Sequence, residues 1–277
     1  MVRFHFVATP IGNLGDLTFR ALDTLKAADV VFCEDTRHSR KLMSHFGLSK
    51  KLISFHDFSG VQDLERISAL IADGQNCVYI SDAGTPMLSD PGYEIARFLE
   101  QAGIPYDVIP GANAVLPALQ LSGLPCDRFC FCGFLGRKES EIEEMFHRFG
   151  HVPATLVYYQ SPKRIRRTIQ ILEQIWPDRE IAVLKELTKL HQQVKKGLPA
   201  TLIPLYTDHE KGEFVLVIAP PSTGDSGPDW ALLAKHFLLL VENGMSRKGA
   251  TRYLARTFEV SSKELYARSM DWDSPRA

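Results

Sequence analysis

Residues 81–92 read SDAGTPMLSDPG, and this stretch constrains the fold more than any other. It follows an apolar run at 77–80 that is typical of a buried strand, and a helical pattern begins just after it, near Glu94. Its glycines let the backbone approach a ligand closely, and its prolines hold the loop in one shape. Ligands of parallel α/β sheets bind beyond the carboxyl ends of the strands, so this stretch predicts a binding loop.

Short apolar strands alternate with helical patterns on both sides of this loop, which predicts an α/β protein with largely parallel sheets. A first set of strands is expected at 4–8, 30–33, 51–54, 77–80 and 106–109, with helices starting near 16, 36, 61 and 94 and another at 114–121. A second set is expected at 129–134, 155–159, 180–184 and 214–219, with helices at 141–149 and 162–176.

A chain of 277 residues is too long for one ordinary core, so we expect two α/β domains and a tail. The expected boundaries are 1–121 and 122–220 for the domains, 221–228 for a Pro- and Gly-rich linker, and 229–277 for a small helical extension. Tail helices are expected at 229–243, from 246 to about 257, and from Ser261, where Ser261 and Glu264 fit a capping box.

The last two tail helices resemble a helix-turn-helix in outline, and the first of them carries Arg247, Lys248, Arg252 and Arg256. Contact with nucleic acid and simple helix packing both fit this pattern. Positive charge also gathers at 160–196, where nine Lys and Arg stand against four acidic residues. That run fits a polyanionic partner or a solvated helix face.

Composition excludes several classes of protein. Apolar residues make up 45% and charged residues 23% of the chain, and no apolar run approaches the roughly 20 residues of a membrane span, so we expect a cytoplasmic globular protein without membrane contact. The five cysteines form no CxxC pair, which predicts buried free thiols and no metal site. Neither a GxGxxG nor a GxxxxGK[ST] loop is present, which disfavours an NAD enzyme or a kinase.

Six ordered motifs, VATPIGNLGDLTFRAL, CEDTRHS, SDAGTPMLSDPGY, SGLPCDRFCFCGFL, KELTK and KGEFVLVI, resemble the ribosomal RNA small subunit methyltransferase I family of the tetrapyrrole methylase superfamily. The resemblance covers about Phe4 to Ile218, and the tail is similar to that family's helical extension. It implies the two-domain fold of class III methyltransferases, with S-adenosylmethionine (SAM) bound between the domains, and a homodimer. The implied reaction is 2'-O-methylation of a cytidine in 16S rRNA, with the rRNA or the assembled small ribosomal subunit as partner.

By matching position along the chain, the resemblance implies SAM contacts from both domains. They are Pro10, Ser81, Asp82, Ala83, Gly84, Thr85, Leu88, Gly111, Asn113 and Ala114 in the first domain, and Tyr159, Lys185 and Glu213 in the second. Asp82 has two interpretations, since its carboxylate can cap its own loop or accept hydrogen bonds from the ribose or ammonium group of SAM.

Methyl transfer from a sulfonium depends mostly on alignment, but a ribose hydroxyl has a high pKa and benefits from a base or a nearby cation. Glu186 is our candidate base and Lys189 our candidate electrostatic stabiliser, and a plain surface ion pair between them is the alternative. Guanidinium and ammonium groups suit phosphate contacts, and the candidates are Arg37, Lys163, Arg164, Arg166 and Arg167.

The chain departs from the family pattern at three places. It reads His56-Asp57-Phe58-Ser59 where further polar residues are expected, lacks a proline after Leu135, and has Gln192 where glutamate is usual. His56 can contact a base or the ribose, but beside Phe55 and Phe58 we expect a partly buried packing residue. These departures leave the donor site intact and concern the RNA substrate. Two alternative functions stay open, methylation of a small tetrapyrrole-like substrate and RNA binding without catalysis.

Overall fold

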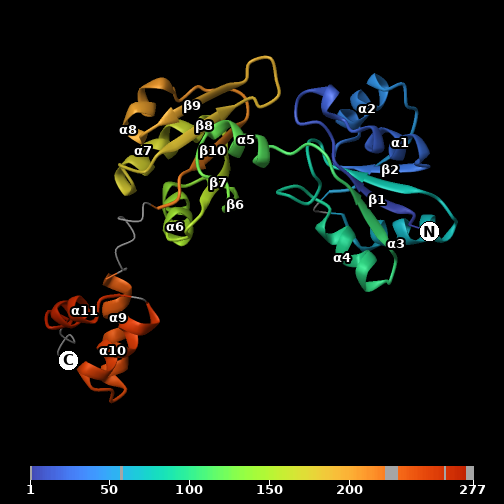
Figure 1. The fold of residues 1–277 in the computed structure, drawn as a ribbon. Helices are drawn as coiled ribbons and strands as arrows, with labels where there is room; N and C mark the ends of the chain where they lie inside the picture. The colour runs from blue at the N-terminus through green and yellow to red at the C-terminus, as the bar shows by residue number, and fades with distance from the viewer. Residues whose placement is uncertain (1, 57–58, 222–229, 259, 273–277) are drawn as a thin grey trace. The chain divides into compact units, whose positions relative to one another are not determined.

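The computed structural model describes residues 2–56, 59–221, 230–258 and 260–272 (Figure 1). Packing contacts divide the chain into two units, residues 1–220 and 221–277. Among the described residues, the first unit holds two five-stranded sheets and the second holds three helices. The predicted linker at 221–228, apart from Pro221, lies outside the described residues.

The first sheet is entirely parallel, with the strand order β3-β2-β4-β1-β5. Its strands are β1 (Phe4–Val7), β2 (Val30–Cys33), β3 (Lys51–Ser54), β4 (Cys77–Ile80) and β5 (Tyr106–Ile109). The intervening helices are η1 (Leu14–Asp16), α1 (Phe19–Ala27), α2 (Thr36–His45), α3 (Val61–Ala72) and α4 (Tyr93–Gln101). Four of the five strands have the bounds that the sequence predicts.

Helices cover both faces of this sheet, α1 and α2 on one side and α3 and α4 on the other (Figure 1). Two of the three inner strands, β2 and β4, are buried at every residue, which explains their unbroken apolar runs. Polar side chains start the helices on the first face. Thr18 accepts a hydrogen bond from the Ala21 N–H at the start of α1, and Asp35 accepts one from the Arg37 N–H at the start of α2.

The second sheet has the order β6-β7-β10-β8-β9, and only its β6–β7 pair is parallel. The prediction of largely parallel sheets is therefore wrong here. Its strands are β6 (Phe129–Phe134), β7 (Thr155–Gln160), β8 (Ile181–Lys185), β9 (Gln193–Gly197) and β10 (Phe214–Ile218). The sequence missed β9, because QVKKG is a polar edge strand without the apolar alternation that marks a half-buried one.

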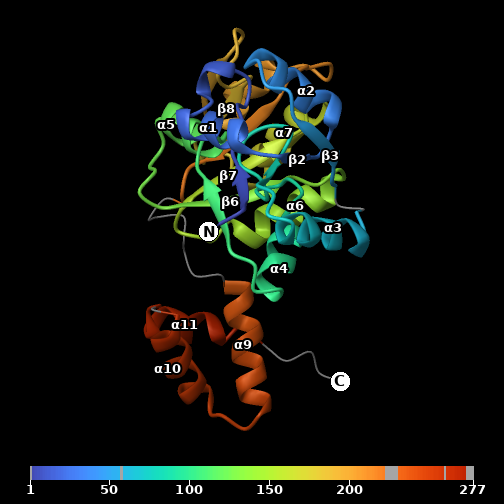
Figure 2. The same ribbon diagram turned by 90° about the vertical axis from the view of Figure 1, so that its right-hand side faces the viewer.

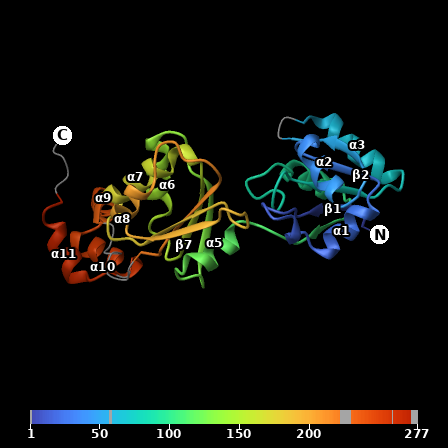
Figure 3. The same ribbon diagram turned by 90° about the horizontal axis from the view of Figure 1, so that it is seen from above.

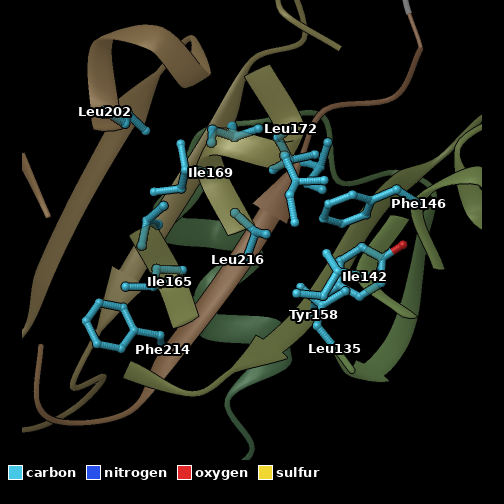
Figure 4. Packing of buried hydrophobic residues seen from close by; sticks show 14 of the residues in the cluster. Leu135, Ile142, Phe146, Tyr158, Ile165, Ile169, Leu172, Leu202, Phe214 and Leu216 are labelled. Atoms are coloured by element: carbon cyan, nitrogen blue, oxygen red, sulfur yellow. The ribbon is translucent and has the colours of Figure 1, made fainter. Parts of the chain in front are cut away.

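One face of this sheet packs against α6 (Glu139–Phe149), α7 (Ile165–Ile175), α8 (Pro199–Leu202) and η3 (Ile203–Leu205). The short helix η2 (Pro162–Arg164) lies between β7 and α7 in the chain. Figure 4 shows Ile165, Ile169 and Leu172 of α7 facing Leu216, while Phe146 of α6 meets the ring of Tyr158 edge-on. Aliphatic side chains of α7 thus cover the middle of the sheet, and aromatic rings fill the side toward β6.

The opposite face of the second sheet packs against α5 (Val115–Ser122), as Figure 3 shows. Val115, Ala118 and Leu119 of this helix pack on Ala182, Leu184 and the two valines of β10. The domain boundaries remain a prediction, but this packing favours a first boundary before Val115 rather than after residue 121. The sequence alone predicts a helix at 114–121 without saying which sheet it covers.

The described part of the second unit contains α9 (Trp230–Glu242), α10 (Arg247–Thr257) and α11 (Ser262–Ser269), which Figure 2 shows as a group. These helices pack around Leu233, Phe237, Ala250, Leu254 and Leu265. Ser261 is the N-cap of α11 and accepts a hydrogen bond from the Glu264 N–H at 3.4 Å. The Glu264 carboxylate accepts a bond from Arg268 instead of completing the predicted capping box. Of the predicted turn at 258–260, Glu259 lies outside the described residues.

The prediction of buried free thiols is only partly confirmed. Cys33 and Cys77 are buried thiols as predicted, but Cys126 is exposed and Cys130 and Cys132 are only partly buried. His56 is exposed rather than partly buried, and the neighbouring Asp57 and Phe58 lie outside the described residues. Among the described helices, none combines the length and the apolar character needed to cross a lipid bilayer.

Candidate active site

Strained backbone marks two loops of the first unit. Among the described residues, four other than glycine have positive φ, namely Met87, Ser89, Glu186 and Thr188. The first two lie in the loop at 81–92, and the other two lie in the turn that follows β8. Such conformations cost free energy in L-residues and cluster at functional sites, so both loops are candidates for binding.

Two cavities among the described residues of this unit bear on the site, and the larger of them, about 310 Å³, is lined by loops from both sheets. Its lining includes Ile11, the run from Ala83 to Thr85, Leu88, Asp90, Asn113 and Ala114 from the first half of the unit, and Phe134, the run from Tyr159 to Pro162 and the run from Gly212 to Val215 from the second. Apolar and aromatic side chains predominate, with a few polar groups among them. The volume lies at the lower end of the roughly 300–1,000 Å³ typical of small-molecule sites.

Gly84 shapes the wall of the larger cavity. Its φ is +78°, and a Cβ at this position would lie 3.2 Å from Cγ2 of Ile11, so a side chain here is both strained and crowded. Backbone hydrogen bonds join Gly84 to Thr9 in both directions, at 2.8 and 3.0 Å. The loops after β1 and β4 are therefore locked together at this point.

A smaller cavity, about 220 Å³, lies on the other side of the hydrogen-bonded pair Thr9–Gly84. It is lined by Thr9, Pro10, Leu14, His38, Ser39, Lys41, Leu42, Ile80, Ser81 and Asp82. In the loop after β1, the smaller cavity is lined by Thr9 and Pro10 and the larger one by Ile11. In the loop after β4, the smaller cavity is lined by Ser81 and Asp82 and the larger one by Ala83 to Thr85. The two cavities therefore share one wall, made of two short loop segments.

Three charged side chains form a network behind the larger cavity. Nζ of Lys189 lies 3.0 Å from Oε1 of Glu186 and 2.9 Å from Oε2 of Glu213. Oε1 of Glu186 also accepts a hydrogen bond from the Glu213 N–H at 2.9 Å. The carbon chain of Lys189 packs directly on Gly12, in the loop that forms part of the shared wall. The network thus connects the turn after β8 to the cavity lining.

These contacts set the charge state of the network. Burial acts to raise the pKa of Glu186, but the hydrogen bonds from Glu213 N–H and Lys189 outweigh it, and the net pKa is lowered. Burial acts to lower the pKa of Lys189, but hydrogen bonds to Glu213 and Glu186 outweigh it, and the net pKa is raised. Glu186 is thus a carboxylate and Lys189 an ammonium at neutral pH. A lowered pKa makes a carboxylate a weaker base, so the base role of Glu186, still a prediction, loses support.

Tyr159 contributes a neutral phenol to the larger cavity. Burial, with a smaller contribution from the Asp90 carboxylate, raises its pKa to about 12. Its ring contacts Phe131 and Phe134, which hold it against the end of β6. The hydroxyl is therefore a hydrogen-bonding group that keeps its proton across the physiological range.

Comparison with known proteins identifies the family of this chain. The sequence profile of the Tetrapyrrole (Corrin/Porphyrin) Methylases matches residues 3–203. A Synechocystis relative named "Ribosomal RNA small subunit methyltransferase I" is 38% identical over 274 residues, covering 98% of both chains. An Escherichia coli O157:H7 relative of the same name is 34% identical over 273 residues, covering 97% of this chain and 95% of its own. The chain belongs to the ribosomal RNA small subunit methyltransferase I family of the tetrapyrrole methylases.

Solved structures agree with this fold. The methyltransferase CobJ superposes with a TM-score of 0.60 at 19% identity, covering 82% of this chain and 98% of its own. Uroporphyrin-III-C-methyltransferase from Thermus thermophilus superposes with a TM-score of 0.56 at 23% identity, covering 78% and 94%. At these identities the likeness shows the fold alone. The class III methyltransferase fold expected from the sequence is confirmed.

For a member of this family, the predicted SAM contacts divide into three groups. Most line the larger cavity, namely Ala83, Gly84, Thr85, Leu88, Asn113, Ala114, Tyr159 and Glu213. Pro10, Ser81 and Asp82 line the smaller cavity instead. Gly111 and Lys185 line neither. Gly111 packs against Ala8, and Lys185 forms an ion pair with Glu210 at 2.7 Å.

The sequence did not single out several lining residues of the larger cavity. Asp90 belongs to the SDAGTPMLSDPGY motif, and Gly212 precedes Glu213 in the KGEFVLVI motif. Membership of these motifs was a signal that could have identified both residues. Gly212 has φ of +97°, and a Cβ there would lie 2.8 Å from Oε1 of Glu186. Phe134, Gln160 and Ser161 sit at strand ends, where only the fold shows that the strands converge on one cavity.

The predicted phosphate-binding residues are spread along the unit, and most have acidic or polar partners. Arg37 pairs with Asp35 at 2.7 Å and, through its hydrogen bonds, lowers the pKa of that carboxyl to about 2. Arg166 pairs with Asp208, and Arg167 pairs with Glu139. Arg164 donates to Gln160, while Lys163 is exposed. Partnered guanidiniums on the surface can exchange a carboxylate for a phosphate, so RNA contact stays a prediction.

The tail carries a basic hollow of its own. A hollow of about 540 Å³ lies between α10 and α11, lined by Lys248, Thr251, Arg252, Ser262, Lys263 and Tyr266. All three of its cations are exposed. Three cations with a tyrosine between two short helices have the chemistry that nucleic-acid surfaces share.

Proposed function

We propose that this protein transfers a methyl group from SAM to the ribose 2'-oxygen of a cytidine in small-subunit rRNA. The observation that carries the proposal is the match, along 98% of both chains, to a relative named for methylating small-subunit ribosomal RNA. That coverage includes the helical tail, which a small macrocyclic substrate does not require. The tetrapyrrole alternative is left with support from family membership and fold alone.

The larger cavity fits the methyl donor. It combines an apolar lining with a close backbone approach at Gly84 and hydrogen-bonding groups at Asn113, Tyr159 and Glu213. An adenosine with an amino-acid tail offers complementary surfaces, namely a flat apolar ring system at one end and an ammonium with a carboxylate at the other. When bound there, SAM supplies an electrophilic sulfonium methyl group.

The residues of this chain then have two tasks. The locked loops after β1 and β4 position both reactants, which is the main source of rate in a displacement at carbon. Lys189 presents an ammonium beside the shared wall, where a positive charge favours loss of the proton from a ribose hydroxyl. Glu186 and Glu213 hold that ammonium in place.

We also propose a cytoplasmic location, because small ribosomal subunits are made there. We also propose a homodimer. The edge strands β5 and β6 support this, because they expose Tyr106, Val108 and Phe129, and exposed apolar edge strands are a common site of self-association. Light scattering of the purified chain tests this part, and a monomeric mass at working concentration contradicts it.

One labelling experiment tests the activity. Purified protein is incubated with methyl-labelled SAM and either unmethylated small subunits or tetrapyrrole precursors, and the label is then mapped. We expect label in rRNA at one cytidine, with the adjoining phosphodiester resistant to alkali because the 2'-oxygen is blocked. Label in the macrocycle selects the small-molecule alternative, and label in neither selects RNA binding without catalysis.

A further inference from the structure

The smaller cavity has a definite place relative to the larger one, although the proposed donor site does not include it. The two cavities share the wall in which Thr9 and Gly84 are joined by paired backbone hydrogen bonds. A group-transfer enzyme needs two adjacent sites, one for the donor and one for the acceptor. If the larger cavity holds the donor, the smaller one is placed to hold part of the acceptor.

The lining of the smaller cavity suits a flat polar ring. Leu14, Leu42 and Ile80 supply apolar surface, while His38, Lys41 and Asp82 supply polar groups. Its volume of about 220 Å³ is below that of most drug-sized sites, which favours a single base over a larger ligand. Enzymes that modify nucleotides commonly take one nucleotide out of the stack and read its base in such a pocket.

Ser39 adds evidence that the cavity is built to bind. The residue is 2% exposed, and its Oγ has no oxygen or nitrogen partner among the described residues. The Cys33 thiol beside it is only a weak hydrogen-bonding group. A buried hydroxyl without a strong hydrogen-bond partner costs free energy unless a ligand supplies that partner. Ser39 is therefore a candidate contact to a base carbonyl or ring nitrogen.

The carboxylate of Asp82 determines which nucleobase the smaller cavity can accept. Its Oδ1 accepts a hydrogen bond from the Asp35 N–H at 3.1 Å, which fixes the orientation of the carboxylate at the cavity wall. A carboxylate only accepts hydrogen bonds, and it pairs with the exocyclic amino group of cytosine. Uracil carries a carbonyl oxygen in the same place, which a carboxylate repels.

We propose that the smaller cavity binds the unstacked base of the target nucleotide and that Asp82 selects cytosine by accepting a hydrogen bond from its amino group. This inference rests on the proposed function, and it assigns Asp82 to the acceptor rather than to SAM. Lys41 and His38 at the mouth of the cavity then lie near the ribose and phosphate of the same nucleotide.

The substitution Asp82→Asn tests the selection directly. Asparagine keeps an oxygen for the Asp35 N–H but presents an amide donor to the base, which suits uracil. The variant and the wild type are compared on small subunits carrying cytidine or uridine at the mapped position. We expect kcat/KM on cytidine to fall about tenfold and the preference to shift toward uridine by about 100-fold, with the Kd for SAM unchanged.

A second variant tests occupancy without changing charge. Ser39→Val adds volume inside the cavity, and Ser44→Val, on the exposed side of the same helix, is its matched control. We expect the first to lower kcat/KM on small subunits at least about tenfold and the second to leave it unchanged, with SAM binding equal in both.

The outcomes separate this proposal from the proposed function. Wild-type label in rRNA together with an undiminished cytidine preference in Asp82→Asn overturns the base assignment alone. A loss of SAM affinity in Asp82→Asn returns this residue to the donor site and likewise overturns it. Wild-type protein that places no label in rRNA overturns both proposals.

Discussion

The two cavities differ in the elements that line them, and this difference separates donor binding from acceptor binding. The larger cavity is lined by loops from both sheets, whereas the smaller one is lined by the loops after β1 and β4 of the first sheet together with η1 and α2. Their shared wall consists of two loop segments that the Thr9–Gly84 hydrogen bonds lock in place. We therefore expect substitutions to separate into those that weaken SAM binding and those that slow transfer to RNA without weakening it.

The largest effect is expected at Gly84, in the wall itself. Gly84→Val forces a β-branched residue into a φ of +78° and against Ile11, so SAM affinity should fall more than about 100-fold. Isothermal titration calorimetry measures this. Gly103→Val is the matched control, because Gly103 has a φ of +66° but nothing within 4 Å of an added Cβ. Equal SAM affinity in both variants would contradict the assignment of the larger cavity.

The next effect is expected at Lys189, behind the wall. Lys189→Met keeps the carbon chain that packs on Gly12 but removes the ammonium, so kcat on small subunits should fall about 100-fold while the Kd for SAM changes little. Lys211→Met, which removes an exposed charge two residues before Glu213, is the control. A kcat close to that of wild type would leave Lys189 as a structural ion pair.

A smaller effect is expected from the tail. Reversing two charges of its basic hollow, with Lys248→Glu and Arg252→Glu, should raise KM for small subunits about tenfold at low salt and flatten the dependence of KM on salt. Lys235→Glu on α9 reverses a charge outside the hollow and is the control. An unchanged KM would favour simple helix packing as the role of these helices.

The smallest effect is expected at Glu186. Glu186→Gln should keep kcat within about threefold at neutral pH, because a carboxylate with a lowered pKa contributes little as a base. A loss of 100-fold or so would restore it as the general base.

The same variant gives a prediction about pH. The folded-state pKa of Glu186 is below its ordinary value of 4.5, so its stabilising contribution is present above that value and is lost as pH falls through the folded pKa. The difference in Tm between wild type and Glu186→Gln should therefore hold from pH 6 to 8 and shrink below about pH 4.5. A difference that grows in acid would contradict the lowered pKa.

Much of the fold could be predicted because the first sheet is buried on both faces. Its central strands appear as unbroken apolar runs, and the glycines and prolines of 81–92 mark a strand end. The second sheet was harder, because antiparallel pairing and the polar edge strand β9 follow from partners far along the chain. The face that α5 covers is likewise a property of tertiary packing.

The sequence predicts which loops form the candidate site, but it does not predict which of the two cavities each loop residue lines. The motif at 81–85 pointed to a ligand, yet Ser81 and Asp82 line one cavity and Ala83 to Thr85 the other. Which side each residue faces depends on the backbone turn at Gly84 and on its pairing with Thr9. In the same way, the ion pair between Lys189 and Glu213 joins the turn after β8 to the start of β10, which lie far apart in the sequence.

The most direct test of the central claim is a crystal structure of the protein soaked with SAM. The account predicts density for the donor in the larger cavity, against Gly84, Asn113 and Tyr159, with the smaller cavity left open to RNA. Density for SAM in the smaller cavity, or none in either, would contradict the division between donor and acceptor sites.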